Sequence, residues 1–159
     1  MRRGNAVALL VGSIWLANAA GVTSEDGANG ATLAGTWTGK KDEWQAGNCS
    51  GGDKDLAVRL IIGVQPDGEL TANVMTARTF QGQSLRQSSQ WHGQFSAPDK
   101  VEFAETKLAS CRGEDREYTL RLRGKIRTKD GKLRLVLDGK DETCPEMGCV
   151  FHERFTLER

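Results

Sequence analysis

The chain has 159 residues, of which 22 are Lys or Arg and 21 are Asp or Glu, so its formal net charge is only +1. This length suits one domain preceded by a short leader. Binding driven by bulk charge needs a strong excess of one sign, so the composition gives no reason to expect a nucleic-acid partner.

Residues 1–19 have the layout of a secretory signal peptide. A positively charged start precedes an apolar run from Ala6 to Leu16, and Ala17-Asn18-Ala19 is a small-x-small cleavage site. The run is shorter than the about 20 apolar residues that span a bilayer, and no later stretch approaches that length, so we expect no transmembrane segment in the mature chain. The sequence predicts a secreted or periplasmic protein with a flexible lead-in over residues 20–32 and one domain over residues 33–159.

After the leader, apolar and polar residues alternate with a period of two, which is typical of strands with one buried and one wet face. The clearest inward faces are Leu56, Val58, Leu60, Ile62 and Val64; Tyr118, Leu120, Leu122, Gly124 and Ile126; and Leu133, Leu135 and Leu137. Other strand signals lie near residues 33–40, 69–77, 86–95, 101–108 and 149–157. Because no segment of the mature part has a helical period, the sequence predicts an all-β domain of about eight strands.

The connections between these strands are alternately short and long. The short ones are the turn sequences Pro66-Asp67-Gly68, Ala97-Pro98-Asp99 and Lys129-Asp130-Gly131. The longer ones cover about residues 41–54, 78–85, 109–116 and 140–148. In an antiparallel meander alternate connections lie at opposite ends, so all the short turns would fall at one end. We therefore predict an eight-stranded antiparallel up-and-down barrel, with a β-sandwich as the alternative.

The four cysteines, Cys49, Cys111, Cys144 and Cys149, lie in or beside the longer connections. We expect them together at one end of the barrel, which we call the mouth. An even count in an exported chain predicts two disulfides, and we expect no metal and no cofactor. The first expected pairing is Cys144–Cys149 with Cys49–Cys111. The alternative joins neighbouring connections, as Cys49–Cys149 and Cys111–Cys144, and the sequence does not decide between them.

The segment Leu33-Ala34-Gly35-Thr36-Trp37 resembles the first strand of calycin barrels, the group that includes lipocalins and avidins. The shared feature is Gly-x-Trp near the start of the mature chain, here Gly35 and Trp37. The resemblance implies a β-barrel able to hold a ligand, in which the first tryptophan packs across the closed end against an arginine of the last strand. Arg154 or Arg159 would take that place.

Five residues are candidates to line an interior ligand site. Glu153 shares an inward strand face with Phe155, where a carboxylate either anchors a ligand or pairs with an inward cation. Glu105 is a similar case on another strand. Gln87, Ser89 and Trp91 follow one another on one face, and such a polar-then-aromatic lining suits a small, oriented ligand.

Two further sets of residues are candidates to contact larger partners. Trp44, in the long first connection, and Met147, between the last two cysteines, would contact a protein at the mouth. Arg121, Arg123, Lys125 and Arg127 form a basic row on one outward face. Like charges in neighbouring positions repel unless they are offset, so this row suits an anionic surface partner or a solvated face balanced by nearby acids.

The chain has only two histidines, His92 and His152, and it has no nucleophile elbow and no phosphate loop. We therefore expect no catalytic residues and no enzymatic activity. The sequence predicts a binding protein that holds a small, partly apolar ligand inside the barrel. The alternative is an envelope inhibitor of the lysozyme or protease type, which binds another protein through the disulfide-fastened mouth loops.

Overall fold

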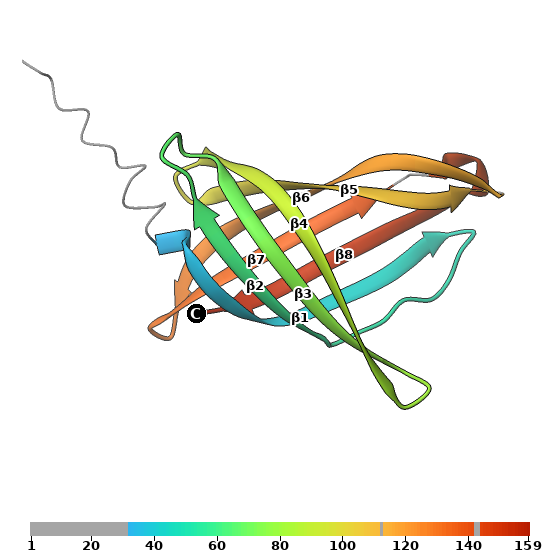
Figure 1. Cartoon of the computed structure of the whole chain (residues 1–159), viewed down its shortest axis with the longest axis horizontal. Coiled ribbons are helices and arrows are strands. Elements are labelled where there is room, and N and C mark those ends of the chain that lie inside the picture. Colours follow the sequence, from blue (N-terminus) through green and yellow to red (C-terminus); the bar gives the residue numbers. More distant parts are fainter. Residues whose placement is uncertain (1–31, 112, 142–143) are drawn as a thin grey trace, which may run out of the picture.

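A computed structural model describes residues 32–111, 113–141 and 144–159, and the expected signal peptide lies outside them. Eight antiparallel strands close into one barrel in sequence order (Figure 1). They are β1 (Gly35–Gly47), β2 (Leu56–Val64), β3 (Leu70–Phe80), β4 (Gln83–Ala97), β5 (Lys100–Cys111), β6 (Glu114–Lys129), β7 (Lys132–Asp141) and β8 (Cys149–Glu158), with one short 3₁₀ turn, η1 (Pro145–Met147). The predicted up-and-down barrel is confirmed, and the sandwich alternative is wrong because β1 pairs with both β2 and β8.

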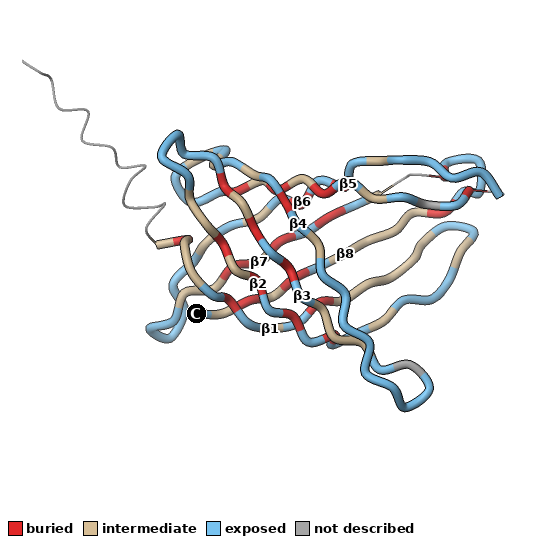
Figure 2. The backbone as a smooth tube through the Cα atoms, viewed as in Figure 1, coloured by how far each residue is buried: buried red, intermediate tan, exposed pale blue. Residues whose placement is uncertain are grey.

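The apolar core fills the half of the barrel that is remote from the cysteines. The alternating residues predicted from the sequence point inward there, and Leu60, Leu122, Leu135 and Leu137 are fully buried. Figure 2 shows the buried positions recurring along the strands where the barrel is closed, whereas the long hairpins at the other end are mostly exposed. Burial of these side chains at roughly 25 cal/mol per Å² is the main stabilising contribution to the fold.

Trp37 closes the core at the end opposite the mouth. Its side chain is fully buried, and its indole Nε1 donates a hydrogen bond of 2.8 Å to the carbonyl oxygen of Leu33. The guanidinium of Arg159 lies over the ring, 5.6 Å from its centre, and donates to the carbonyl oxygen of Ala34. Gly35 fits this contact because its φ is +124° and a Cβ would lie 2.8 Å from Nη1 of Arg159. Arg159, and not Arg154, therefore packs on the first tryptophan.

Two of the four connections expected to be long are instead the tips of long hairpins. β3 and β4 continue to Phe80 and Gln83, and only Gln81 and Gly82 connect them. Both connecting residues have positive φ, 49° and 78°, as a type I′ turn requires. The strand signal is missing from the sequence around 78–85 because this hairpin leaves the barrel wall (Figure 1), so both its faces are wet and no apolar alternation is needed.

The wall is not continuous between β4 and β5. Their pairing runs from Ala97 and Lys100 to His92 and Ala104, and it ends there. Beyond that point β4 remains paired with β3 as far as Gln83, and β5 remains paired with β6 as far as Cys111. Each strand therefore presents one free edge in the mouth half of the barrel, and we call the space between these edges the β4–β5 opening.

Candidate functional site

A layer of charged side chains lies inside the barrel between the apolar core and the mouth. Period-two spacing places them on the inward faces of three strands. The members of this interior charged layer are Lys41 and Glu43 on β1, Glu105 and Lys107 on β5, and Glu153 on β8.

The five charged groups alternate in sign along one chain of ion pairs. Nζ of Lys41 lies 2.6 Å from Glu43 and 3.1 Å from Glu153. Nζ of Lys107 lies 2.8 Å from Glu153 and 3.4 Å from Glu105. Lys41 and Glu105 are only 8% and 9% exposed, so the pairing offsets much of the desolvation cost of burying these charges.

Neighbouring charges favour the ionised forms of Glu43 and Lys107 in this layer. Burial raises the pKa of Glu43, but the hydrogen bond and charge of Lys41, together with the charge of Arg78, outweigh it, and the net pKa is lowered. Burial lowers the pKa of Lys107, but the carboxylates of Glu153 and Glu105 outweigh it, and the net pKa is raised. Both groups therefore remain ionised over the whole neutral range.

Three aromatic rings form the boundary between the charged layer and the core. Trp91 meets Phe155 edge to face, with ring centres 5.1 Å apart, and meets Phe103 at 5.9 Å. Nζ of Lys41 lies 5.2 Å from the centre of the Phe155 ring. Phe155 thus contacts both Trp91 and the charged layer, and this junction is the centre of the candidate site.

Polar atoms at this junction have no partner. Among the described residues, the indole Nε1 of Trp91 and Oε2 of Glu153 are buried side-chain atoms without a hydrogen bond. Nε of Arg78, whose Nη2 lies 2.7 Å from Glu43 and 2.9 Å from Asp53, is a third. A buried donor or acceptor left unpaired costs about 1–3 kcal/mol. Trp91 and Glu153 therefore carry a buried donor and a buried acceptor that no described protein group satisfies.

The structure brings together three of the five predicted lining residues. Trp91, Glu105 and Glu153 lie at the junction or in the interior charged layer, and Glu153 is paired with lysines, as the ion-pair interpretation of this residue required. Ser89 is half-buried farther out on β4. Gln87 is exposed, because β4 has left its pairing with β5 at that point.

Sequence reasoning missed the two lysines and Glu43. Lys41 and Glu43 follow Trp37 at two-residue intervals on β1, so their inward phase was readable from the sequence. They were assigned to a long connection because charged residues at inward positions interrupt the apolar pattern. Lys107 follows Glu105 with the same phase on β5. The available signal was the two-residue spacing of these residues together with the opposite charges of neighbours on the same face.

The two predicted protein-contact residues lie on separate elements. Trp44 is not in a loop: it lies within β1, opposite His152 of β8, and stacks on its ring with centres 5.0 Å apart and planes 3° apart. This stacking leaves Trp44 half-buried. Met147 ends η1 and is 38% exposed.

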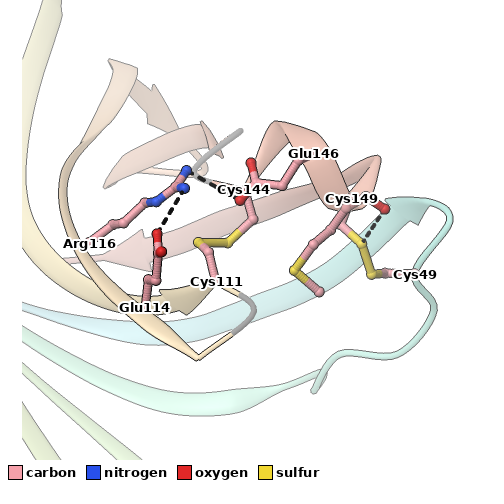
Figure 3. Close-up of a disulfide and its surroundings, with 8 residues drawn as sticks. Cys49, Cys111, Glu114, Arg116, Cys144, Glu146 and Cys149 are labelled. Atoms are coloured by element: carbon pink, nitrogen blue, oxygen red, sulfur yellow. Dashed lines mark hydrogen bonds and ion pairs between the residues drawn. A yellow bond between two sulfur atoms is a disulfide. The ribbon is translucent and has the colours of Figure 1, made fainter.

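All four cysteines lie at the mouth, as predicted, but the first expected pairing is wrong. The disulfides are Cys49–Cys149 and Cys111–Cys144, with Cα–Cα distances of 5.2 and 5.7 Å (Figure 3). Cys149 pairs in register with Gly47, so the ladder of β1 and β8 delivers Cys49 to its partner. With every cysteine in a disulfide, none is a thiolate ligand.

A small ion-pair cluster lies beside the second disulfide. Arg116 lies 3.5 Å from Glu114 on its own strand and 3.2 Å from Glu146 of η1 (Figure 3). The Cys111–Cys144 bridge and this cluster both tie the β5–β6 hairpin to the segment that precedes β8.

The basic row on β6 is divided between paired and unpaired residues. Arg121 and Arg123 both bind Glu102, at 3.0 and 2.9 Å. Lys125 and Arg127 have no ion-pair partner among the residues that the structure describes. The row is therefore only half balanced by neighbouring acids.

The chain matches no protein-family model, and no curated protein is similar to it. Within the described part of the chain, no helix has the length and apolar character needed to cross a membrane, and no group of three His, Cys, Asp or Glu residues is arranged to hold a metal ion.

Proposed function

We propose that this chain is an exported, non-enzymatic binding protein of the calycin type, which holds a small, partly apolar and uncharged molecule inside its barrel. The observation that carries the proposal is the pair of buried, unpartnered atoms at the junction, Trp91 Nε1 and Glu153 Oε2. The first requires an acceptor and the second requires a donor. Hydroxyl and amide groups have both a donor and an acceptor.

The surroundings support the same chemistry. The rings of Trp91, Phe103 and Phe155 offer an apolar wall, and a few polar groups that fix orientation are typical of small-molecule sites. The interior charged layer adds cations and anions in nearly equal number, so it favours no net charge on the ligand. The β4–β5 opening, where no ladder joins the two strands, is the proposed route of access.

Export and the calycin relationship are part of this proposal. Two disulfides at the mouth suit an oxidising compartment outside the cytosol. Gly35 and Trp37, together with Arg159 stacked on the indole, match the closed end that the resemblance implies.

The test uses 2-naphthol, a neutral fluorescent probe whose hydroxyl both donates and accepts. We expect saturable binding that Trp91→Phe weakens about fivefold or more, because an aromatic side chain is kept while the N–H donor and part of the ring system are lost. 2-Methoxynaphthalene, which cannot donate, should bind more weakly than 2-naphthol and should be indifferent to Glu153→Gln. Trp44→Phe, at the stacked surface tryptophan, is the matched control and should leave binding unchanged.

A native mass spectrum of the exported protein complements the probe, since it shows any molecule carried through purification. No retained molecule and no saturable binding of either naphthalene would overturn the proposal. Binding that is equally weakened by Trp91→Phe and Trp44→Phe would also overturn it, because the site would not be at the junction.

A second candidate function is the binding and inhibition of another protein. The observation that favours it is the free edges of β4 and β5, since a row of unpaired backbone groups accepts an extended strand from a partner. Leu85 and Leu108, on these two strands, are 46% and 75% exposed. In this version the contact surface is the β4–β5 opening in addition to Trp44 and Met147.

Inhibition of a c-type lysozyme and of a trypsin-like protease tests this alternative directly. We expect an active inhibitor to lose potency when Leu108→Asp places a charge beside the free edge, whereas Leu133→Ala at the opposite end should leave potency unchanged in the folded protein. Absence of inhibition and of binding to both enzymes would reject the inhibitor function as stated.

A further inference from the structure

A basic hollow lies on the outside of the barrel, at the end remote from the cysteines. It has a volume of about 730 Å³ and lies against β6, β7 and the start of β5. The turns that join β4 to β5 and β6 to β7 lie at this end, where the C-terminus also lies (Figure 1). Six cations line it, and they are Lys100, Arg123, Lys125, Arg127, Lys129 and Arg134.

Paired positions on neighbouring strands carry like charges around the hollow. Lys100 pairs in register with Lys125, and Arg127 pairs with Arg134. At the β6–β7 turn Lys129 pairs in register with Lys132. Like charges directly opposite each other on a sheet are destabilising. The fold therefore carries three like-charged pairs in or beside one patch.

Local acids neutralise only part of this patch. Arg123 is held by Glu102 at 2.9 Å, and Arg134 is held by Glu158 at 2.9 Å. Within the described ranges Lys100, Lys125 and Arg127 have no ion-pair partner. The acid that lines the hollow, Asp138, is itself bound by Arg154 at 2.6 Å.

We propose that this basic hollow binds an acidic polysaccharide, a chain that bears sulfate or carboxylate groups on successive sugar units. Lys125, Arg127 and Lys129 alternate along β6 with a repeat of about 6.7 Å, so they present a row of cations about 13 Å long to an extended anionic chain. Ser96 and Thr128 also line the hollow, and both residue types carry a hydroxyl that can hydrogen-bond to sugar hydroxyls.

Two other polyanions fit the hollow less well. Single-stranded nucleic acid is bound through bases stacked on aromatic rings, and no aromatic side chain lines the hollow. A lipid surface is bound by cations flanked by apolar side chains that insert into it. The large apolar residues that are exposed in the described chain, Met75, Leu85, Leu108 and Met147, do not line the hollow.

The hollow is separate from the interior site, because it lies on the opposite side of the barrel wall and at the opposite end from the mouth. A single protein could therefore carry its ligand while attached to an acidic matrix or capsule. The two activities are separable by mutation.

The test is calorimetric titration of the full folded protein with a heparin-derived hexasaccharide. We expect saturable binding that weakens steeply with added salt, since it rests on charge. The double variant Lys125→Gln/Arg127→Gln should bind about tenfold or more weakly. The matched control Lys54→Gln/Arg59→Gln removes the same charge from exposed positions near and on β2 and should bind as the unaltered protein does.

Circular dichroism of each variant verifies that the barrel is intact. No binding of the hexasaccharide, or an equal loss in both double variants, would overturn the proposal. Two further arms use an oligodeoxythymidylate and phosphatidylglycerol vesicles. Tighter binding of either one, lost in Lys125→Gln/Arg127→Gln and kept in the control, would assign the hollow to nucleic acid or to lipid and overturn the polysaccharide assignment.

Discussion

Glu43 and Glu153 occupy paired positions on β1 and β8, and the ammonium group of Lys41 contacts both carboxylates, at 2.6 and 3.1 Å. Two carboxylates that share a mostly buried site repel each other unless a cation separates them. The interior charged layer therefore depends on Lys41, which links the anion of the first strand to that of the last strand.

Replacing Lys41 by Met keeps most of the side-chain volume and removes the charge. We expect the free energy of unfolding to fall by about 1–3 kcal/mol, because Glu43 and Glu153 each lose a buried partner, although Arg78 and Lys107 still pair with them. Urea-induced unfolding followed by circular dichroism measures the change. Lys40→Met is the matched control: Lys40 pairs with Asp55 at 2.7 Å in open solvent, where pairing contributes little. Equal losses in the two variants would show that burial does not distinguish these ion pairs.

The single tyrosine of the chain reports on the mouth half of the barrel. Burial and the nearby carboxylate of Asp141 raise the pKa of Tyr118 to about 12. Absorbance of the tyrosinate should therefore rise near pH 12 in the folded protein and near pH 10 in urea. Asp141→Asn should lower the folded midpoint, whereas Asp130→Asn at the β6–β7 turn should not. A folded midpoint at pH 10 would contradict the assignment.

The same shift predicts how stability depends on alkaline pH. A raised pKa favours the neutral phenol in the folded state, so this contribution of Tyr118 is fully present below pH 10 and is lost as the pH rises through about 12. Lys107, whose net pKa is also raised, contributes in the same direction above its ordinary value. The free energy of unfolding should therefore decline above pH 10, and urea midpoints measured from pH 8 to pH 12 check this.

The two disulfides should differ in their contribution to stability. The Cys49–Cys149 bridge spans 100 residues and Cys111–Cys144 spans 33. By loop entropy, their removal as paired serine variants should lower the free energy of unfolding by about 4.7 and about 3.7 kcal/mol. Peptide mapping under non-reducing conditions checks the pairing itself. A peptide that joins Cys144 to Cys149 would contradict the structure.

Close approach of β1 and β8 predicts a glycine requirement at one inward position. A Cβ at Gly39 would overlap the carbonyl oxygen of Thr156 and lie 2.9 Å from Cα of Leu157. Gly39→Ala should therefore lower the free energy of unfolding by about 1–3 kcal/mol. Gly63→Ala is the control, because its Cβ would meet only the hydroxyl of Thr71, at 3.1 Å. Equal stability of the two alanine variants would argue against strand approach as the cause.

The sequence by itself determined the barrel. Period-two alternation depends only on which face of each strand is buried. It can therefore be read at Leu60, Leu122 and Leu135 without knowing which strands lie beside them. The alternation of turn signals then placed the cysteines at one end. The inward phase of Glu105 and Glu153 was readable in the same way, because it continues from Phe103 and Phe155.

Only the tertiary structure decided which residues meet across the barrel. Register between β1 and β8 pairs Cys49 with Cys149, and strand approach places Lys41 between Glu43 and Glu153. The end of the β4–β5 ladder at His92 exposes Gln87, although its phase is the same as that of buried Trp91. These outcomes depend on the stagger of strands around a closed sheet, a long-range quantity that no local pattern of residues encodes.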